Sequence, residues 1–196
     1  CLQNLPVIFT LDRAGLVGED GPTHHGAFDL TYLRMMPNMT VMAPRNQEEL
    51  RDMLWAALDY DGPVAIRYPR GAGSSRDVGP EAKTVALGKA DMLREGKDVA
   101  LIAVGRMAEI ALEATAILSR EGIEAAVVNA RFVKPMDEEL FAGLASDYRV
   151  LVTLEDNVIN GGFGEGVATG RTRCLIHPRG GVRVSITRMP VVHLLQ

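Results

Sequence analysis

The side chains best suited to chemistry in the first half of the chain gather in one short stretch, GEDGPTHHGAFD at Gly18–Asp29. His24 and His25 are the only histidines among the first 170 residues. A histidine titrates near neutral pH and can serve as general acid, general base or hydrogen-bond donor. Asp20 could hold a substrate hydroxyl. The same residues also suit a plain surface loop, in which the histidines cap a turn and Asp-Gly-Pro forms one.

Two arginines are candidates to complete this site. Arg13 follows the first predicted strand and Arg70 follows the third. The carboxyl ends of parallel strands meet at one edge of a sheet, where ligands bind in open α/β folds. The planar fork of arginine suits phosphate, although either residue could equally be a solvated surface charge. If both converge with His24 and Asp20 on one cleft, the cluster suits sugar-phosphate chemistry.

Strand and helix patterns alternate in the first half. The apolar run LPVIFTL at Leu5–Leu11 predicts a strand covered on both faces. The clearest helix starts after Asn46, which can cap it while Glu49 reaches back in a capping box. Its expected core face is Leu50, Met53, Leu54, Ala57 and Leu58. The other expected elements are a helix at Ala27–Met36 and strands at Met39–Met42 and Pro63–Tyr68.

The second half repeats this alternation after a Gly- and Ser-rich stretch at 71–83, which predicts a linker. Expected strands are Asp98–Gly105, Glu124–Asn129 and Arg149–Leu154, and expected helices are Met107–Glu121 and Asp137–Ala145. The fold class is therefore α/β, with two three-layer domains built on parallel sheets. The GGFGEG segment at Gly161–Gly166 does not fit GxGxxG, so we interpret it as a tight strand-to-helix turn rather than a nucleotide site.

Composition narrows the function classes. The chain has 196 residues, a formal net charge of −4 and no apolar run long enough to cross a membrane, which argues against nucleic-acid and membrane partners and favours the cytoplasm. Cys1 and Cys174 have no metal-ligand or disulfide spacing. From residue 171 to 196 there are five arginines and no acidic residue, which sets a divergent basic tail apart from the acidic remainder.

Several motifs together carry a family resemblance over residues 1 to about 168. The segments are DRAGLVGEDGPTHHGAFDLTYLR, PNMTVMAPRNQEEL, DGPVAIRYPRG, RFVKPMDEEL and LEDNVINGGFGEG. They resemble the 1-deoxy-D-xylulose-5-phosphate synthase family of transketolase-like enzymes. GEDGPTH is shared with transketolases in general, whereas HGAFD and RYPRG are similar to the synthases in particular.

This resemblance implies a thiamine-diphosphate-dependent transferase that condenses pyruvate with glyceraldehyde 3-phosphate, with loss of CO2, in isoprenoid precursor synthesis. It also implies a homodimer that uses Mg²⁺. By motif position His24 would contact the reacting carbonyl oxygen and move protons. Asp20 would hold a hydroxyl of the aldehyde, while Arg13 and Arg70 would bind its phosphate.

The resemblance further implies a carboxy-terminal fragment: residues 1–70 from the pyrimidine-binding domain, 84–170 from the transketolase C-terminal domain, truncated, and 171–196 a tail. The family's cofactor anchors would lie upstream of Cys1, so the fragment alone should be inactive. For the tail we hypothesise a shifted reading frame near Thr169, with one helix and one strand of the last domain missing. Alternatives are a transketolase, a 2-oxo acid dehydrogenase beta subunit, or a non-catalytic binding module.

Overall fold

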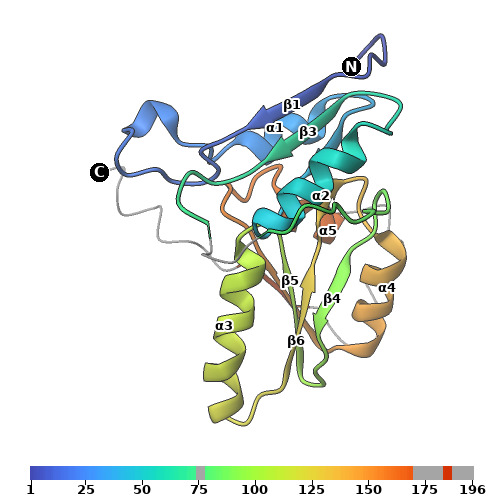
Figure 1. Cartoon of the computed structure of the whole chain (residues 1–196). Helices are drawn as coiled ribbons and strands as arrows, with labels where there is room; N and C mark the ends of the chain where they lie inside the picture. The colour runs from blue at the N-terminus through green and yellow to red at the C-terminus, as the bar shows by residue number, and fades with distance from the viewer. Residues whose placement is uncertain (74–77, 170–182, 187–196) are drawn as a thin grey trace.

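The computed structural model describes residues 1–73, 78–169 and 183–186, in which two mixed sheets are stacked with helices around them (Figure 1). The expectations for residues 74–77, and for the tail apart from 183–186, lie outside this part of the chain. No helix within it is long and apolar enough to cross a membrane.

The first sheet has the strand order β1-β3-β2-β7 and holds the first-half strands. Strand β3 pairs in parallel with both β1 and β2. The two helices pack on opposite faces, because Val41 and Ala65 belong to the core cluster of α1, whereas Met42 and Ile66 belong to that of α2. The elements are β1 (Ile8–Leu11), α1 (Asp29–Met35), β2 (Thr40–Met42), α2 (Gln47–Ala57), β3 (Val64–Arg67) and β7 (Phe132–Lys134).

The second sheet has the order β4-β6-β5-β8-β9, and α3 covers the face opposite to α4 and α5. Strands β6, β5, β8 and β9 are parallel, and β4 is an antiparallel edge strand. The elements are β4 (Asp91–Arg94), β5 (Val99–Ala103), α3 (Met107–Arg120), β6 (Ala125–Asn129), α4 (Glu138–Asp147), β8 (Val150–Leu154), α5 (Phe163–Thr169) and β9 (Arg183–Ile186). Strand β9 falls within the range expected to form a divergent tail.

The two halves share one core and one sheet edge. Strand β7 comes from the second half, yet it pairs antiparallel with β2 of the first sheet. One buried cluster contains Leu30 and Val41 from the first half together with Ile102 and Phe163 from the second. The α/β class and the three layers in each half are as predicted. The sheets are not purely parallel, because β4 and β7 run against their neighbours.

Two packing expectations were wrong. Strand β1 is not covered on both faces: Phe9 is 46% exposed, because β1 lies at the sheet edge and no described element covers it. Along α2 the buried face is rotated, so that Leu54 is 44% and Leu58 66% exposed, while Glu49 and Asp52 are buried. These two acids are tolerated inside because both have hydrogen-bonding partners.

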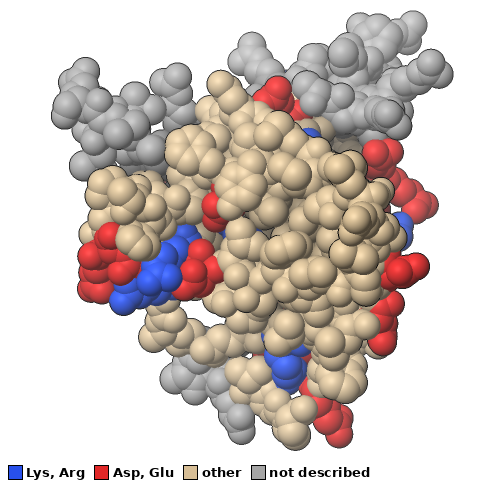
Figure 2. All heavy atoms as spheres, turned by 90° about the horizontal axis from the view of Figure 1, so that it is seen from above, with Lys and Arg blue, Asp and Glu red and all other residues tan. Residues whose placement is uncertain are grey.

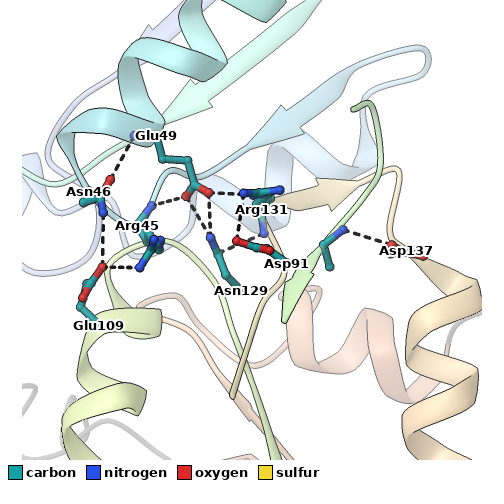
Figure 3. Close-up of polar contacts among 9 residues, drawn as sticks. Arg45, Asn46, Glu49, Asp91, Glu109, Asn129, Arg131 and Asp137 are labelled. Carbon is teal, nitrogen blue, oxygen red and sulfur yellow. Dashed lines mark hydrogen bonds and ion pairs between the residues drawn. The ribbon is translucent and has the colours of Figure 1, made fainter. Parts of the chain in front are cut away.

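Figure 3 shows how Glu49 joins the halves at the start of α2. Asn46 caps the helix as predicted, since its Oδ1 accepts from the Glu49 amide at 3.0 Å. The reciprocal bond of a capping box is replaced: the Glu49 carboxylate accepts from the Arg45 amide at 2.8 Å and, across the domain boundary, from Arg131 Nε at 2.8 Å and Asn129 Nδ2 at 2.9 Å. The second half thus contributes both to the sheet that carries the candidate site and to its helix.

Candidate active site

Three of the four predicted site residues meet in one ion-pair cluster. The Asp20 carboxylate accepts a hydrogen bond from Arg13 Nε at 2.8 Å and another from Arg70 Nη1. Arg13 comes directly after β1 and Arg70 shortly after β3, so the neighbouring strand ends bring them together, as expected. Asp20 lies in the loop between, and its side chain is 17% exposed, against 32% for Arg13 and 46% for Arg70.

The charges in this cluster stabilise one another. Hydrogen bonds from Arg70 and then Arg13 hold the pKa of Asp20 below its ordinary value. In turn the hydrogen bond to Asp20 is the main reason why the pKa of each arginine is raised. The cluster is therefore a fixed carboxylate between two cations, with Asp12 as a second acid on Arg13 at 2.5 Å.

The predicted acid–base residue lies in the same loop but outside the ion-pair cluster. His24 ends a short 3₁₀ helix (Pro22–His24), is exposed, and has its Nδ1 3.1 Å from Thr23 Oγ1. Among the described residues no hydrogen bond or ion pair joins its ring to Asp20, Arg13 or Arg70. Its neighbour His25 has a structural role, because its Nδ1 accepts a hydrogen bond from the Val17 amide at 3.1 Å. One histidine of the pair thus fastens the loop and the other is exposed to solvent.

A cavity of about 660 Å³ opens beside Arg70 at the boundary between the halves. Its wall includes Arg45 and the start of α2 from the first half, and Arg106 and Glu109 at the start of α3 from the second. Arg45 is paired with Glu109 at 2.9 Å. Among the described residues the lining therefore carries three arginines and one acid, which favours an anionic group.

Sequence reasoning missed two residues that hold the site loop from below, Arg67 and Asp156. Arg67, at the end of β3, is only 2% exposed and forms an ion pair with Asp156, which follows β8. Its Nη2 donates to the Gly26 carbonyl at 2.8 Å. An arginine within a strand covered on both faces, in VAIRY, was the signal that could have identified it, because a fully buried guanidinium needs a partner.

The glycine-rich segment after β8 is a tight turn with close backbone packing, as interpreted. Asn157 Oδ1 accepts from the Leu30 amide of α1 at 3.1 Å, and Val158 donates its amide to the Ala27 carbonyl at 2.8 Å. Arg34 donates to the Gly161 carbonyl at 2.6 Å. This segment docks the second half under α1 and the site loop.

Comparison with known proteins now gives the family. Residues 1–75 match the family described as transketolase, pyrimidine binding domain, and residues 88–193 match transketolase, C-terminal domain. The chain is 52% identical over 174 residues to 1-deoxy-D-xylulose-5-phosphate synthase of Pelotomaculum thermopropionicum, and 53% identical over 167 residues to synthase 1 of Geobacter sulfurreducens. These alignments cover 89% and 85% of this chain but only 27% and 26% of the relatives, so the chain spans about a quarter of their length.

A solved structure described as "Split gene transketolase, inactive beta4 tetramer" superimposes with a TM-score of 0.76 at 35% identity. The superposition covers 86% of this chain and 54% of that one. Sequence, domain order and fold agree: the chain belongs to the transketolase family, and within it is similar to the 1-deoxy-D-xylulose-5-phosphate synthases.

Proposed function

We propose that this chain is the carboxy-terminal part of a 1-deoxy-D-xylulose-5-phosphate synthase, which condenses pyruvate with glyceraldehyde 3-phosphate and releases CO2 to make an isoprenoid precursor. The names of the curated relatives support this activity. The observation that carries the proposal is the bridge formed by Asp20 between Arg13 and Arg70, because it joins motif residues from two segments into one site.

In the proposed site the arginines bind the phosphate of the aldehyde. Arg13 and Arg70 already face one carboxylate, so their donors are oriented toward a shared anion position. The cavity beside Arg70 has room for a three-carbon phosphate and adds Arg45 and Arg106 to its walls. An incoming phosphate would compete with Asp20 for the guanidinium groups and free that carboxylate to accept from a substrate hydroxyl.

His24 is the proposed acid–base residue. It is exposed on the same loop as Asp20, so its ring can reach a ligand without first breaking a buried contact. A neutral imidazole can accept a proton from a substrate hydroxyl, and an imidazolium can donate to a carbonyl oxygen that gains charge. The ring of His25 is held by its hydrogen bond from the Val17 amide, so His24 is the histidine of the pair that is available to a ligand.

Thiamine diphosphate with Mg²⁺ would supply the carbanion chemistry of the whole enzyme. The residues described here do not fit that group: they include no cluster of three or more His, Cys, Asp or Glu side chains able to hold a metal ion, and Asp20 is committed to two arginines. We propose that the anchors for the cofactor belong to the rest of the synthase, and that residues 1–196 by themselves are inactive. The domain boundaries at 70, 84 and 170 are part of the same proposal.

We also propose that the enzyme is a cytoplasmic homodimer. Figure 2 shows a face above β1 and α1 that is largely uncharged, with the charged side chains gathered toward its margins. Large apolar side chains are exposed on these elements and at the N-cap of α1, among them Phe9 at 46%, Phe28 at 59% and Met35 at 70%. Apolar patches of this kind mark surfaces that another protein part covers. The related split-gene transketolase beta chain is described as a tetramer.

The similarity to a split-gene transketolase favours one alternative, a transketolase whose subunits are separately encoded. Substrate use separates the two activities. The full-length protein should release CO2 from carboxyl-labelled pyruvate only when glyceraldehyde 3-phosphate is present, and should not transfer a ketol group from xylulose 5-phosphate. Ketol transfer without pyruvate decarboxylation would overturn the synthase proposal. If the folded, cofactor-loaded protein showed neither of these two activities, a binding module would be favoured.

A further inference from the structure

Arg67 is the most completely buried charged residue in the described chain, and its partners come from both halves of the molecule. Its guanidinium forms the ion pair with Asp156, and its Nη2 donates a hydrogen bond to the Asp156 carbonyl at 3.0 Å. Its Nε lies 3.6 Å from Asp29 Oδ2. Because several partners hold this buried guanidinium, its position is fixed. A further group that it binds is therefore held in a fixed position as well.

Arg67 also binds the backbone of the site loop. The Gly26 carbonyl accepts from Nη2 at 2.8 Å. The Gly26 amide in turn donates to the Arg13 carbonyl at 3.0 Å and the Gly15 carbonyl at 2.8 Å. Gly26 therefore closes the loop that starts at Arg13 and carries Asp20 and His24. Arg67 fastens this closure point to β3.

The counter-charge comes from the other half of the molecule. Asp156 is 6% exposed and follows β8 of the second sheet. It holds Arg67 through both its side chain and its carbonyl. It also fits tightly under the loop, since a Cβ at Gly15 would lie 2.9 Å from Asp156 Oδ2. The second half is thus connected to the candidate site through two polar steps, Asp156 to Arg67 and Arg67 to Gly26.

We propose that Arg67 and Asp156 are positioning residues for the reaction: together they fix the loop from Arg13 to Gly26, so that the second half sets the geometry of a site to which it contributes no predicted catalytic residue. The inference rests on the proposed function for its effect on turnover. Its structural part, the position of the loop, concerns the chain itself and can be tested without activity.

The structural test is hydrogen–deuterium exchange on the 196-residue chain. Asp156→Asn keeps the shape of the side chain but removes the charge. Arg67→Lys keeps a cation for Asp156 but cannot hold the Gly26 carbonyl at the same time. Both variants should exchange at least tenfold faster in peptides spanning residues 13–26. Unchanged exchange in that loop in both variants would overturn the inference.

Glu49→Gln provides a matched control. Glu49 is also a buried acid, 5% exposed, and it also takes an arginine from the other half, but it lies on α2. Glu49→Gln should speed hydrogen–deuterium exchange in α2 and leave exchange in the 13–26 loop at the wild-type rate. Equal loosening of the loop by this variant would mean that general domain docking, not the Arg67 contact, holds it, and the inference would be lost.

The functional test uses the full-length synthase loaded with thiamine diphosphate and Mg²⁺. Arg67→Lys should lower kcat at least tenfold and raise KM for glyceraldehyde 3-phosphate, with cofactor affinity within about twofold of wild type. Faster loop exchange with wild-type kcat would overturn a role in the reaction. A wild-type enzyme without synthase activity would instead refute the proposed function, and the exchange result would still decide whether Asp156 and Arg67 position the loop.

Discussion

The Asp20 carboxylate receives the guanidinium of Arg70, 50 residues further along the chain, and this contact ties the end of β3 to the site loop. The hydrogen bond lowers the pKa of Asp20 and raises that of Arg70, so both remain charged over the neutral range. A phosphate that enters the site therefore meets an arginine already oriented, at the cost of displacing one carboxylate.

Arg70→Ala should raise KM for glyceraldehyde 3-phosphate by about 10- to 100-fold in the full-length enzyme, since hydrogen bonds between charged groups contribute roughly 1.5–3 kcal/mol. KM for unphosphorylated D-glyceraldehyde should change little. Steady-state kinetics with both aldehydes make the comparison. Arg120→Ala, at the far end of α3, is the control and should match wild type. An equal effect of Arg70→Ala on both aldehydes would mean that Arg70 does not bind phosphate.

His24→Ala should lower kcat by about 10²- to 10⁴-fold, the usual contribution of a general acid or base. Affinity for thiamine diphosphate, measured by titration of the full-length protein, should stay nearly constant. His25→Asn serves as its control, because the Asn oxygen can replace the Nδ1 that accepts from Val17. If His25→Asn lost as much turnover as His24→Ala, the acid–base role would have been given to the wrong histidine.

Elements β1 and α2 show how much of the fold local sequence could predict. An apolar run located β1 and helical periodicity located α2, because both patterns report which residues are apolar. It could not tell that β1 lies at a sheet edge, where Phe9 is exposed, since strand order depends on the whole chain. On α2 the burial of Glu49 depends on Arg131, 82 residues away, and no local pattern contains that partner.

The candidate site divides in the same way. The motifs brought out Arg13, Asp20 and Arg70, which the structure joins, and His24, which it leaves at the rim of the loop. Arg67 and Asp156 were passed over because an ion pair across 89 residues has no signature in either segment. Strand β7 was missed for a similar reason: FVK is too short for a period, and its partner β2 is in the other half.

Gly26→Ala should destabilise the chain by about 1–3 kcal/mol, the usual cost of forcing extra volume into a packed site. A Cβ at this position would lie 2.4 Å from Asp29 Oδ2 and 2.5 Å from the Arg13 carbonyl oxygen, and the latter is backbone that cannot swing aside. Gly18→Ala in the same loop is the matched control, because a Cβ there meets nothing within 4 Å. Urea unfolding measures the free energy of unfolding of both variants. Similar values would show that the backbone around Gly26 can make room for a Cβ atom.

Glu49→Ala should cost roughly 1–3 kcal/mol, because it leaves Arg131 Nε and Asn129 Nδ2 without their acceptor at the boundary between the halves, while Arg131 keeps Asp91 as a partner. The adjacent Glu48 is exposed on the same helix, so Glu48→Ala should stay within about 0.5 kcal/mol of wild type. Equilibrium unfolding monitored by far-UV circular dichroism measures both. A small loss for Glu49→Ala would mean that water satisfies these donors when the carboxylate is removed.

Glu155 gives the chain a pH-dependent contribution of unusual sign. Its carboxylate accepts from the amides of Phe163 and Gly164 at 2.7 and 2.8 Å, at the start of α5. The side chain is nonetheless buried, and burial outweighs these hydrogen bonds and raises its pKa above the ordinary 4.5. The folded protein therefore binds this proton more tightly than the unfolded chain does.

Stability from this group should accordingly be greatest below pH 4.5, fall as pH rises toward the raised folded pKa, and stay level above it. Glu155→Gln removes the ionisation, so the stability of wild type relative to Glu155→Gln should shrink as pH rises through that window. Urea unfolding of both proteins from pH 4 to 7 measures the difference, and Glu48→Gln controls for the loss of one carboxyl. A difference that widens with pH would mean that the two amides and the nearby arginines, not burial, govern this carboxyl.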